Sequence, residues 1–387
     1  MYDLTHFVDI HPGGKDWIRS TRGTDITELF ECYHITDKPY ALLQRYHVKD
    51  VTTPRNSPYT FHTDGFYNTF KRKIQPILKE IGRGPTNTIL LLQDGFVMTY
   101  VLLTLAATLT HSYTFAVLAG LLLCLTMIGA HNFFHQRDNF RMYYFDLSLL
   151  SSYDWRITHG ISHHVYPNTI YDHEIALLEP FFHFLPSPYK SLVLRYGSWV
   201  YEQPLFLVAL MLEGLKRLLG LLLGWGKLRP ENFLPFLQFL LMAILTPSIL
   251  VALKLWVIIH MSCSYSFSVI GLIAGHHHPN IYHHGDCTRT RPDWGLSQLD
   301  AIRDRGEVAG NLFLGLITFG DHTLHHLLPS VDHSKLARLY PVFLDTCRQF
   351  GVPFRFVTVW EMFKGKYLQV ANNTPNLEPP GYKGKME

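Results

Sequence analysis

One uncharged stretch restricts the fold more than any other feature of this chain. From Val97 to Ala130 the sequence contains no Asp, Glu, Lys or Arg. A helix that crosses a bilayer needs about 20 apolar residues, so this stretch is too long for one span. It divides at residues 110–113, "THSY", into two expected helices, of which the first begins near Ile89 and carries Asp94. The stretch therefore predicts an integral membrane protein.

A second apolar stretch runs from Phe233 to Gly275, and Lys254 is its only charged residue. We expect Lys254 to divide it into spans at 233–253 and 255–275. Four spans would place both termini on the same side of the membrane. Of the 34 lysines and arginines, only Lys254 would fall in a short loop on the far side. Because positive residues favour the cytosolic side, we expect both termini in the cytosol.

The other segments contain charged or turn-forming residues that keep them out of the bilayer core. In chain order we expect a module at 1–48, a linker at 49–65, surface-lying amphipathic helices at 66–82 and 204–228, and a polar tail at 366–387. The net charge of only +3 argues against nucleic-acid binding. The five cysteines are scattered without any CxxC, so we expect them to be reduced.

Histidine is unusually frequent, and many of the 23 histidines occur in clusters. Three clusters have metal-ligand spacing: "HNFFH" at 131–135, "HGISHH" at 159–164 and "HTLHH" at 322–326. Histidines at positions i and i+4 lie on the same face of a helix, where they can share a metal ion. A single pair is weak evidence. Three such clusters on one side of a membrane protein indicate a metal site.

The number of histidines indicates two metal ions rather than one. A structural zinc site closes with four ligands, whereas the clusters offer at least eight imidazoles. Imidazole ligation suits zinc, copper, iron or nickel, so the residues alone leave the metal open.

The sequence around the clusters resembles a known family. "DWRITHGISHHVYPN" at 154–168 resembles the second histidine box of integral-membrane fatty-acid desaturases and hydroxylases. "DWGLSQLDA" at 293–301, followed by "GDHTLHHLLPSVDH" at 320–333, resembles the third-box region of the cytochrome b5-fused desaturases. The resemblance implies a mainly α, integral-membrane four-span helical fold with a cytosolic histidine-rich cap. We expect this domain at 66–365, preceded by a partial cytochrome b5-like module.

The box histidines of this family hold a di-iron centre, and a further ligand follows the last span. In the family this segment often reads Asn-His-x-Pro, and in this chain it reads "HHHP" at 276–279. The alignment places His277 on the ligand position. His276 replaces the asparagine, a residue that in relatives can reach the metal through water. We expect His278, His283 and His284 in a solvated loop or around the site. The resemblance thus implies as iron ligands His131, His135, His159, His163, His164, His277, His322, His325 and His326, with Asn132 and His276 as neighbours that orient them or bind through water.

Two positions depart from the family pattern. Asn132 stands where the first box often has Asp, a residue that orients imidazoles, and Asn can still form hydrogen bonds but carries no charge. His322 stands where front-end acyl desaturases usually have Gln. This second change removes no ligand, but it leaves front-end regiochemistry unsupported.

The segment "DIHPGGKDWIRSTRGTDITELFECYH" at 9–34 resembles the haem-binding centre of cytochrome b5, with His11 and His34 as axial ligands. Two histidines fill both axial positions of haem b, so such a haem transfers electrons and does not bind oxygen. Only ten residues precede His11, whereas the cytochrome b5 fold has its first strand and helix there. Two interpretations stay open: the partial module holds haem, or it is a remnant and an external cytochrome b5 donates electrons.

Together these resemblances imply an oxidoreductase of the endoplasmic reticulum membrane. It would introduce a double bond into a lipid acyl chain with dioxygen and electrons from cytochrome b5 or its reductase. Two alternatives remain: lipid hydroxylation on the same di-iron site, and a non-catalytic desaturase-like membrane protein.

Overall fold

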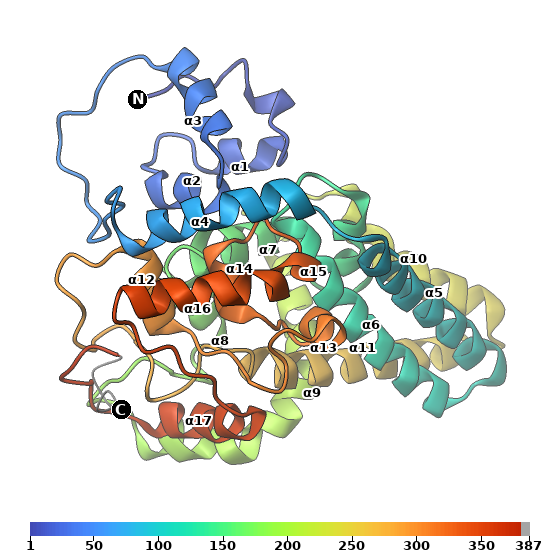
Figure 1. Ribbon diagram of the computed structural model, residues 1–387. Coiled ribbons are helices and arrows are strands. Elements are labelled where there is room, and N and C mark those ends of the chain that lie inside the picture. Colours follow the sequence, from blue (N-terminus) through green and yellow to red (C-terminus); the bar gives the residue numbers. More distant parts are fainter. Residues whose placement is uncertain (381–387) are drawn as a thin grey trace.

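The computed structural model describes residues 1–380, and helices form nearly all of its regular structure. No strand occurs among these residues; three isolated bridges join distant segments: Tyr2 to His47, Thr60 to Asp293 and Arg305 to Val357. Figure 1 shows the N-terminal helices at one end, next to α4, and a group of long helices that extends to one side. The prediction of a mainly α chain is confirmed.

The long helices contain the apolar stretches. Three of them are long and apolar enough to cross a membrane: α5 (Asn87–Thr110), α6 (Tyr113–Phe134) and α11 (Ile249–Leu272). Thr86 and Ser112 cap α5 and α6, since their side-chain oxygens accept hydrogen bonds from the first turns. The division at residues 110–113 is therefore confirmed.

The second apolar stretch divides at a different place from the one expected. Helix α10 (Leu234–Leu245) ends before Thr246, and α11 begins after Ser248, whose hydroxyl accepts from the Leu250 N–H. Lys254 lies inside α11. Pro247 cannot donate a helical hydrogen bond and Ser248 is a good cap, so these two residues set the break. Because Lys254 lies near the start of α11, its long side chain can place the charged end at the membrane–water interface.

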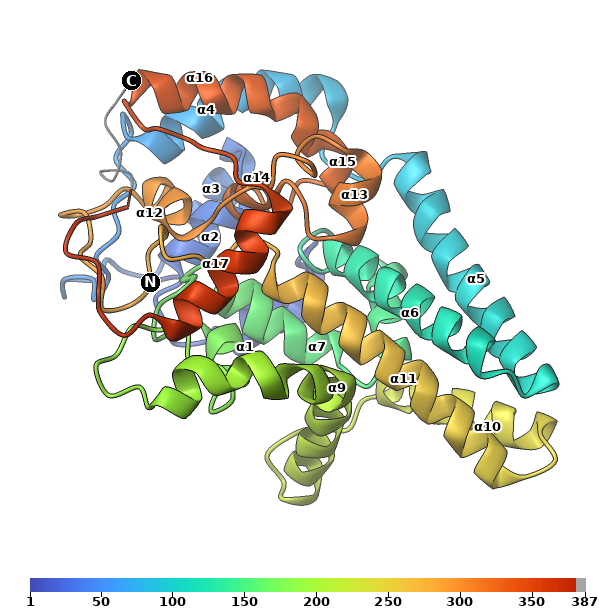
Figure 2. The ribbon, with the colours of Figure 1, turned by 90° about the horizontal axis from the view of Figure 1, so that it is seen from below.

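Helix α10, which precedes this break, is short. A turn at 230–233 extends α10 to Pro230–Leu245, a length below that of the three candidate spans. Figure 2 shows that the α10–α11 and α5–α6 connections lie at the same end of the group. This arrangement is compatible with a fourth crossing, which stays a prediction.

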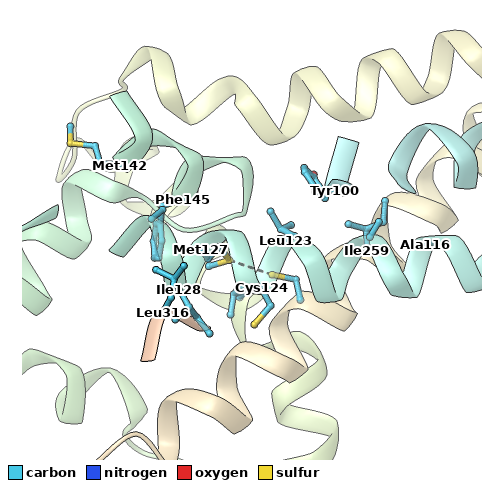
Figure 3. Close-up of a cluster of buried hydrophobic side chains, with 14 of the residues drawn as sticks. Tyr100, Ala116, Leu123, Cys124, Met127, Ile128, Met142, Phe145, Ile259 and Leu316 are labelled. Carbon is cyan, nitrogen blue, oxygen red and sulfur yellow. Dashed lines mark hydrogen bonds between the residues drawn. The ribbon is translucent and has the colours of Figure 1, made fainter. Parts of the chain in front are cut away.

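A buried hydrophobic cluster joins α5, α6 and α11, and Figure 3 shows part of it. Leu123, Met127 and Ile128 of α6 lie near its centre, and the Cys263 thiol of α11 lies 3.3 Å from the Met127 sulfur. Gly120 lets α6 approach α11, because a Cβ there would collide with the Ile259 carbonyl oxygen. Small residues allow the same close packing between other membrane helices.

Helix α9 (Ser198–Leu222), expected as a surface-lying helix, packs along α11. The Ser264 hydroxyl of α11 donates to the Phe206 carbonyl and accepts from the Leu210 N–H. Near the start of α9, Glu202 forms a 2.7 Å ion pair with Lys366 of α17 (Val359–Ala371). Both side chains are buried, so the expected tail boundary at 365/366 falls inside a packed helix. Residues 381–387 of that tail lie outside the described residues.

The remaining short helices build a cap at the other end of α6 and α11. They are α7 (Ser152–Trp155), α8 (His173–Leu178), α12 (Trp294–Ala301), α13 (Leu312–Ile317), α14 (His322–Leu327), α15 (His333–Leu336) and α16 (Tyr340–Gln349). Helix α4 (Phe66–Ile81) confirms the amphipathic helix expected at 66–82. Its apolar side faces protein rather than the membrane surface, because the Phe70 ring packs 5.6 Å from the Phe343 ring of α16.

The N-terminal segment forms three short helices, α1 (Lys15–Ser20), α2 (Thr27–Tyr33) and α3 (Asp37–Leu43). Its two ends meet, since the Val48 N–H donates to the Met1 carbonyl at 2.9 Å. Lys71 of α4 holds α2 through a 2.7 Å ion pair with Glu31, and Gln75 donates to the Ile35 carbonyl. The module is thus docked against the cap.

Candidate metal centre

Nine buried histidines from four segments gather in the cap. His131 and His135 lie at the end of α6, and the other three segments are the turn before residue 165, the loop after α11, and α14. Each offers one ring nitrogen to one of two groups whose nitrogens all lie within 4.8 Å of one another. The first group is His131, His135, His159, His164 and His325; the second is His163, His276, His322 and His326.

A π-helical turn, Arg156–His163, lets the second cluster serve both groups. The His164 N–H donates to the His159 carbonyl at 2.9 Å, a bond between residues five apart. Residues i and i+5 therefore share a side, and His159 and His164 both face the first group. His163 faces the second group. π-Turns of this kind occur often at functional sites.

The ring nitrogens of the first group converge closely. The Nε2 atom of His131 lies 2.7 Å from that of His159, 3.2 Å from that of His135 and 3.1 Å from that of His325. The second group converges on His276, whose Nε2 lies 2.7 Å from that of His322 and 3.1 Å from those of His163 and His326. The stacked rings of His164 and His326, 4.0 Å apart, join the two groups.

The other ring nitrogen of most ligands contacts an acceptor outside the group. His276 Nδ1 faces the Ala301 carbonyl and His322 Nδ1 faces the Phe319 carbonyl, at 3.2 and 2.9 Å. A carbonyl oxygen only accepts, so both Nδ1 atoms carry the proton. Their Nε2 atoms therefore present lone pairs to one another. Such lone pairs repel unless a cation lies between them, which is the arrangement of a metal site with oriented imidazoles.

Burial supports the same protonation state. It strongly lowers the pKa of His135, His164 and His325, because a charged imidazole loses its water on burial. These rings are therefore neutral, as metal ligands must be. The Nδ1 atoms of His131, His164 and His325 have no hydrogen-bond partner among the described residues.

Two carboxylates that were not assigned from the sequence support the second cluster. Glu174 accepts from His159 Nδ1 at 2.7 Å, and Asp172 lies 2.9 Å from His163 Nδ1. Burial lowers the pKa of His163, but these carboxylates together raise it to about 9. They thus place negative charge beside a site for cations. Their positions shortly after "HGISHH", in "YDHE", are the only sequence signal for them.

The structure places His276, and not the expected His277, in a candidate metal-binding group. His276 belongs to the second group, whereas the His277 ring stacks on Phe184 at 3.7 Å and belongs to neither. The chain turns after α11 through Ala274 and Gly275, and a Cβ at Gly275 would lie 2.6 Å from the His322 ring. This close approach brings His276, rather than the next residue, against α14. Alignment to the family motif could not resolve a one-residue shift.

The remaining histidines of the same loop differ from one another. His284 is exposed and His278 is half-buried, but His283 is fully buried. Of the two placements expected for these residues, a solvated loop or a position around the site, His283 does not take the first. Its Nδ1 faces the Ile281 carbonyl at 3.2 Å.

Asn132 follows His131 at the end of α6, and a carboxylate adjoins it. Its amide donates to the buried Asp332 at 2.8 Å, and Gln136 donates to the same oxygen at 3.0 Å. The Asn132 oxygen in turn accepts from Gln136 and from the His333 N–H. Asp332 thus supplies beside α6 the negative charge that residue 132 lacks.

His11 and His34 face each other in the N-terminal module with their ring centroids 6.5 Å apart. Their Nδ1 atoms contact the Gly14 and Phe30 carbonyls, both at 2.9 Å. The Nε2 atoms are therefore the free ligand atoms. Two imidazoles that bind one iron from opposite sides have centroids about 6–6.5 Å apart, since each Fe–N bond is about 2 Å. The residues present fit a haem.

Comparisons with known proteins show the family of the chain. The family model described as "Fatty acid desaturase" matches residues 108–358. A "Cytochrome b5-related protein" of Drosophila melanogaster is 39% identical over 385 residues, which cover 98% of this chain and 88% of that protein. The chain belongs to the fatty acid desaturase family. It is accordingly a desaturase-like oxidoreductase and a membrane protein.

The chain also carries a cytochrome b5 domain. The model "Cytochrome b5-like Heme/Steroid binding domain" matches residues 1–52, and tobacco (Nicotiana tabacum) "Cytochrome b5" is 36% identical over 74 residues, 18% of this chain and 54% of that protein. A "Probable Delta(5) fatty acid desaturase C" of Dictyostelium discoideum is 23% identical over 98% of this chain and 91% of its own length. No solved structure matches the chain.

Proposed function

We propose that this protein is a di-iron oxidoreductase that introduces a double bond into a lipid acyl chain, using dioxygen and electrons from a cytochrome b5 haem. The observation that carries the proposal is the convergence of five and four imidazole nitrogens into two adjacent groups. One zinc ion would use only four of these nine ligands. Two iron ions, when bound, supply dioxygen chemistry that can remove hydrogen from an unactivated carbon.

The ligand set follows the observed groups. His131, His135, His159, His164 and His325 would hold one iron ion, and His163, His276, His322 and His326 the other. Glu174 lies between the groups, because one oxygen contacts His159 and the other is 3.6 Å from His163 Nε2. It keeps both imidazoles in the orientation that the ions require. No side chain has to act as a separate acid or base.

The cytochrome b5 domain would supply the electrons. His11 and His34 would hold haem b through their Nε2 atoms, because their Nδ1 atoms donate to the Gly14 and Phe30 carbonyls and this fixes the tautomer. The domain is docked on the cap in the described residues, so the donor is built into the chain. NADH-dependent cytochrome b5 reductase is the reductant that we expect for this haem.

The membrane supplies the substrate. Helices α5, α6 and α11 form an apolar group that ends at the metal-binding cap, where α6 delivers His131 and the loop after α11 delivers His276. An acyl chain that enters this group from the bilayer would reach the metal ions with its apolar part. We place the cap and both termini in the cytosol, with the protein in the endoplasmic reticulum membrane.

The test combines metal and lipid analysis of the full-length chain in a desaturase-deficient yeast. We expect about two irons per chain and new double bonds in the lipids. New hydroxyl groups would instead establish a lipid hydroxylase, and zinc without any lipid change would establish a non-catalytic membrane protein. His325→Ala should abolish both readouts. His284→Ala is the matched control, because His284 is exposed and belongs to neither group.

A further inference from the structure

One side chain links the two candidate cofactor sites directly. Tyr33 is the last residue of α2 and immediately precedes His34, the candidate haem ligand. Its hydroxyl lies 2.7 Å from Nδ1 of His135, a candidate iron ligand. The same hydroxyl lies 3.2 Å from the Gly160 carbonyl oxygen, inside the second histidine cluster.

The direction of these hydrogen bonds follows from the metal-binding group. His135 directs Nε2 into the first group, so its Nδ1 carries the proton and donates to the Tyr33 oxygen. The Tyr33 O–H is then free to donate to Gly160, whose carbonyl can only accept. Tyr33 thus satisfies both partners and fixes the orientation of the His135 ring.

The docking of the module holds Tyr33 in this position. The Trp17 ring packs 4.8 Å from the Tyr33 ring and also covers Gly160, where a Cβ would lie 2.5 Å from Trp17. The Arg156 guanidinium lies 5.8 Å from the Trp17 ring. From the opposite side, the Ser330 hydroxyl donates to the Tyr33 carbonyl at 3.0 Å.

The loop of the haem-binding motif is fixed as well. The Asp138 N–H, just after the first histidine cluster, donates to the Pro12 carbonyl at 3.2 Å. The Asp138 carboxylate packs against Gly14 and forms a 2.7 Å ion pair with Arg156. The segments that carry His11 and His34 are therefore both attached to the segments that carry the iron ligands.

We propose that Tyr33 is the junction through which electrons pass from the haem to the His135-bound iron, and that its hydroxyl positions His135 for this transfer. The inference rests on the proposed function. Covalent bonds lead from His34 to the Tyr33 hydroxyl, and one hydrogen bond then joins that hydroxyl to His135. Helices α1 and α2 cover this approach to His135, so a separate cytochrome b5 cannot use it.

The electron balance is simple. In each step one ferrous haem iron becomes ferric and one ferric ion of the histidine-bound pair becomes ferrous. Two steps reduce both ions, and a flavoprotein reductase with NADH restores the ferrous haem after each. No covalent bond forms or breaks, and the protons of Tyr33 and His135 stay in place.

The test measures electron transfer itself in the full-length protein. A flash-excited flavin reduces the haem without oxygen, and the absorbance of ferrous haem is followed as the electron leaves. Removal of the hydroxyl in Tyr33→Phe should slow this decay about 10- to 100-fold, the usual effect of removing a ligand's outer partner. Tyr40→Phe is the matched control: its hydroxyl contacts Glu31 in the same module, away from the metal ligands.

The outcomes separate this inference from the proposed function. With full haem and iron content, an unchanged decay in Tyr33→Phe overturns the role of Tyr33 alone. A protein without a Soret band overturns haem binding and, with it, this inference. If Tyr33→Phe loses iron, the decay is measured in Gly160→Ala instead. The added methyl group would displace Trp17 and Tyr33, while the variant retains every histidine ligand. A slower decay in Gly160→Ala supports the junction, and a wild-type decay overturns it.

Discussion

Asn132 and Asp332 lie 200 residues apart in the chain, and the Asn132 amide donates to the Asp332 carboxylate at 2.8 Å. This bond joins the end of α6, with its two iron-ligand candidates, to the segment just before α15. The amide is complementary to the carboxylate, whereas an aspartate at position 132 would oppose it. The relationship explains why this chain tolerates a residue that departs from the family pattern.

A charge exchange tests this complementarity. In Asn132→Asp two buried carboxylates would face each other, and we expect a loss of stability of about 1–3 kcal/mol together with lower iron content. Asn132→Asp combined with Asp332→Asn restores one amide and one carboxylate, so it should recover most of both. Thermal unfolding and metal analysis of the three variants provide the measurement. Additive losses in the double variant would contradict the pairing.

The two adjacent histidines after α11 give a direct test of the proposed ligand assignment. His276→Ala should remove iron, because four Nε2 atoms meet at that position. His277→Ala should keep the iron and lower only stability, since it deletes the stack on Phe184. Metal analysis of the two purified variants distinguishes them. Iron retained in His276→Ala and lost in His277→Ala would restore the assignment made from the motif.

These residues also show what the sequence alone could predict. The helix break at residues 110–113 and the three histidine clusters are local patterns; the break lies where expected, and histidines of all three clusters converge in the structure. The break at Pro247 was missed because a single charge was given more weight than a proline and a cap. Spacing within a cluster shows which histidines share a face. It does not show where a loop such as 274–279 turns, and that turn determines whether His276 or His277 faces α14.

Contacts between distant segments were beyond sequence reasoning. The hydroxyl of Tyr33 contacts His135 across 102 residues, and Asn132 contacts Asp332 across 200. Neither tyrosine nor aspartate stands out in composition or periodicity at these positions. Glu174 lies only 15 residues from His159, but an acidic residue after a histidine cluster is too common to identify an outer partner.

Glu174 should be the most sensitive of the outer residues. Glu174→Gln keeps the size of the side chain but removes the charge that holds His159 and His163. We expect the affinity for iron to fall about 10- to 100-fold. Glu179→Gln is the control, because that half-exposed glutamate pairs with His183 and belongs to none of the candidate metal-binding groups. Competition with a chelator measures the affinity, and equal affinities in both variants would contradict the role of Glu174.

A buried acid outside the site gives a prediction for pH. Burial raises the pKa of Asp146 to about 7, although the Ser152 N–H donates to its Oδ1. The folded protein therefore holds this proton more tightly than the unfolded chain, and stability falls as pH rises from about 4 through 7. At pH 8 the free energy of unfolding of Asp146→Asn should exceed that of wild type by about 1 kcal/mol, which raises its melting temperature. At pH 5 the two proteins should have nearly the same melting temperature. The same difference in melting temperature between variant and wild type at both pH values would refute this.

The topology of α10 and α11 can be tested with cysteines. Cys287 is exposed on the cap, whereas Cys32, Cys124, Cys263 and Cys347 are buried. In sealed microsomes an impermeant maleimide should therefore label the wild type at Cys287 if the cap is cytosolic.

A second cysteine then reports on the far end of the membrane helices. Pro247 is exposed in the α10–α11 connection, which lies at the same end as the α5–α6 connection. In a Cys287→Ser background, Pro247→Cys should label only after the membrane is permeabilised. Labelling before permeabilisation would mean that α10 and α11 enter and leave on the cytosolic side. Because α10 is shorter than a normal span, labelling only after permeabilisation would also require local thinning of the bilayer around it.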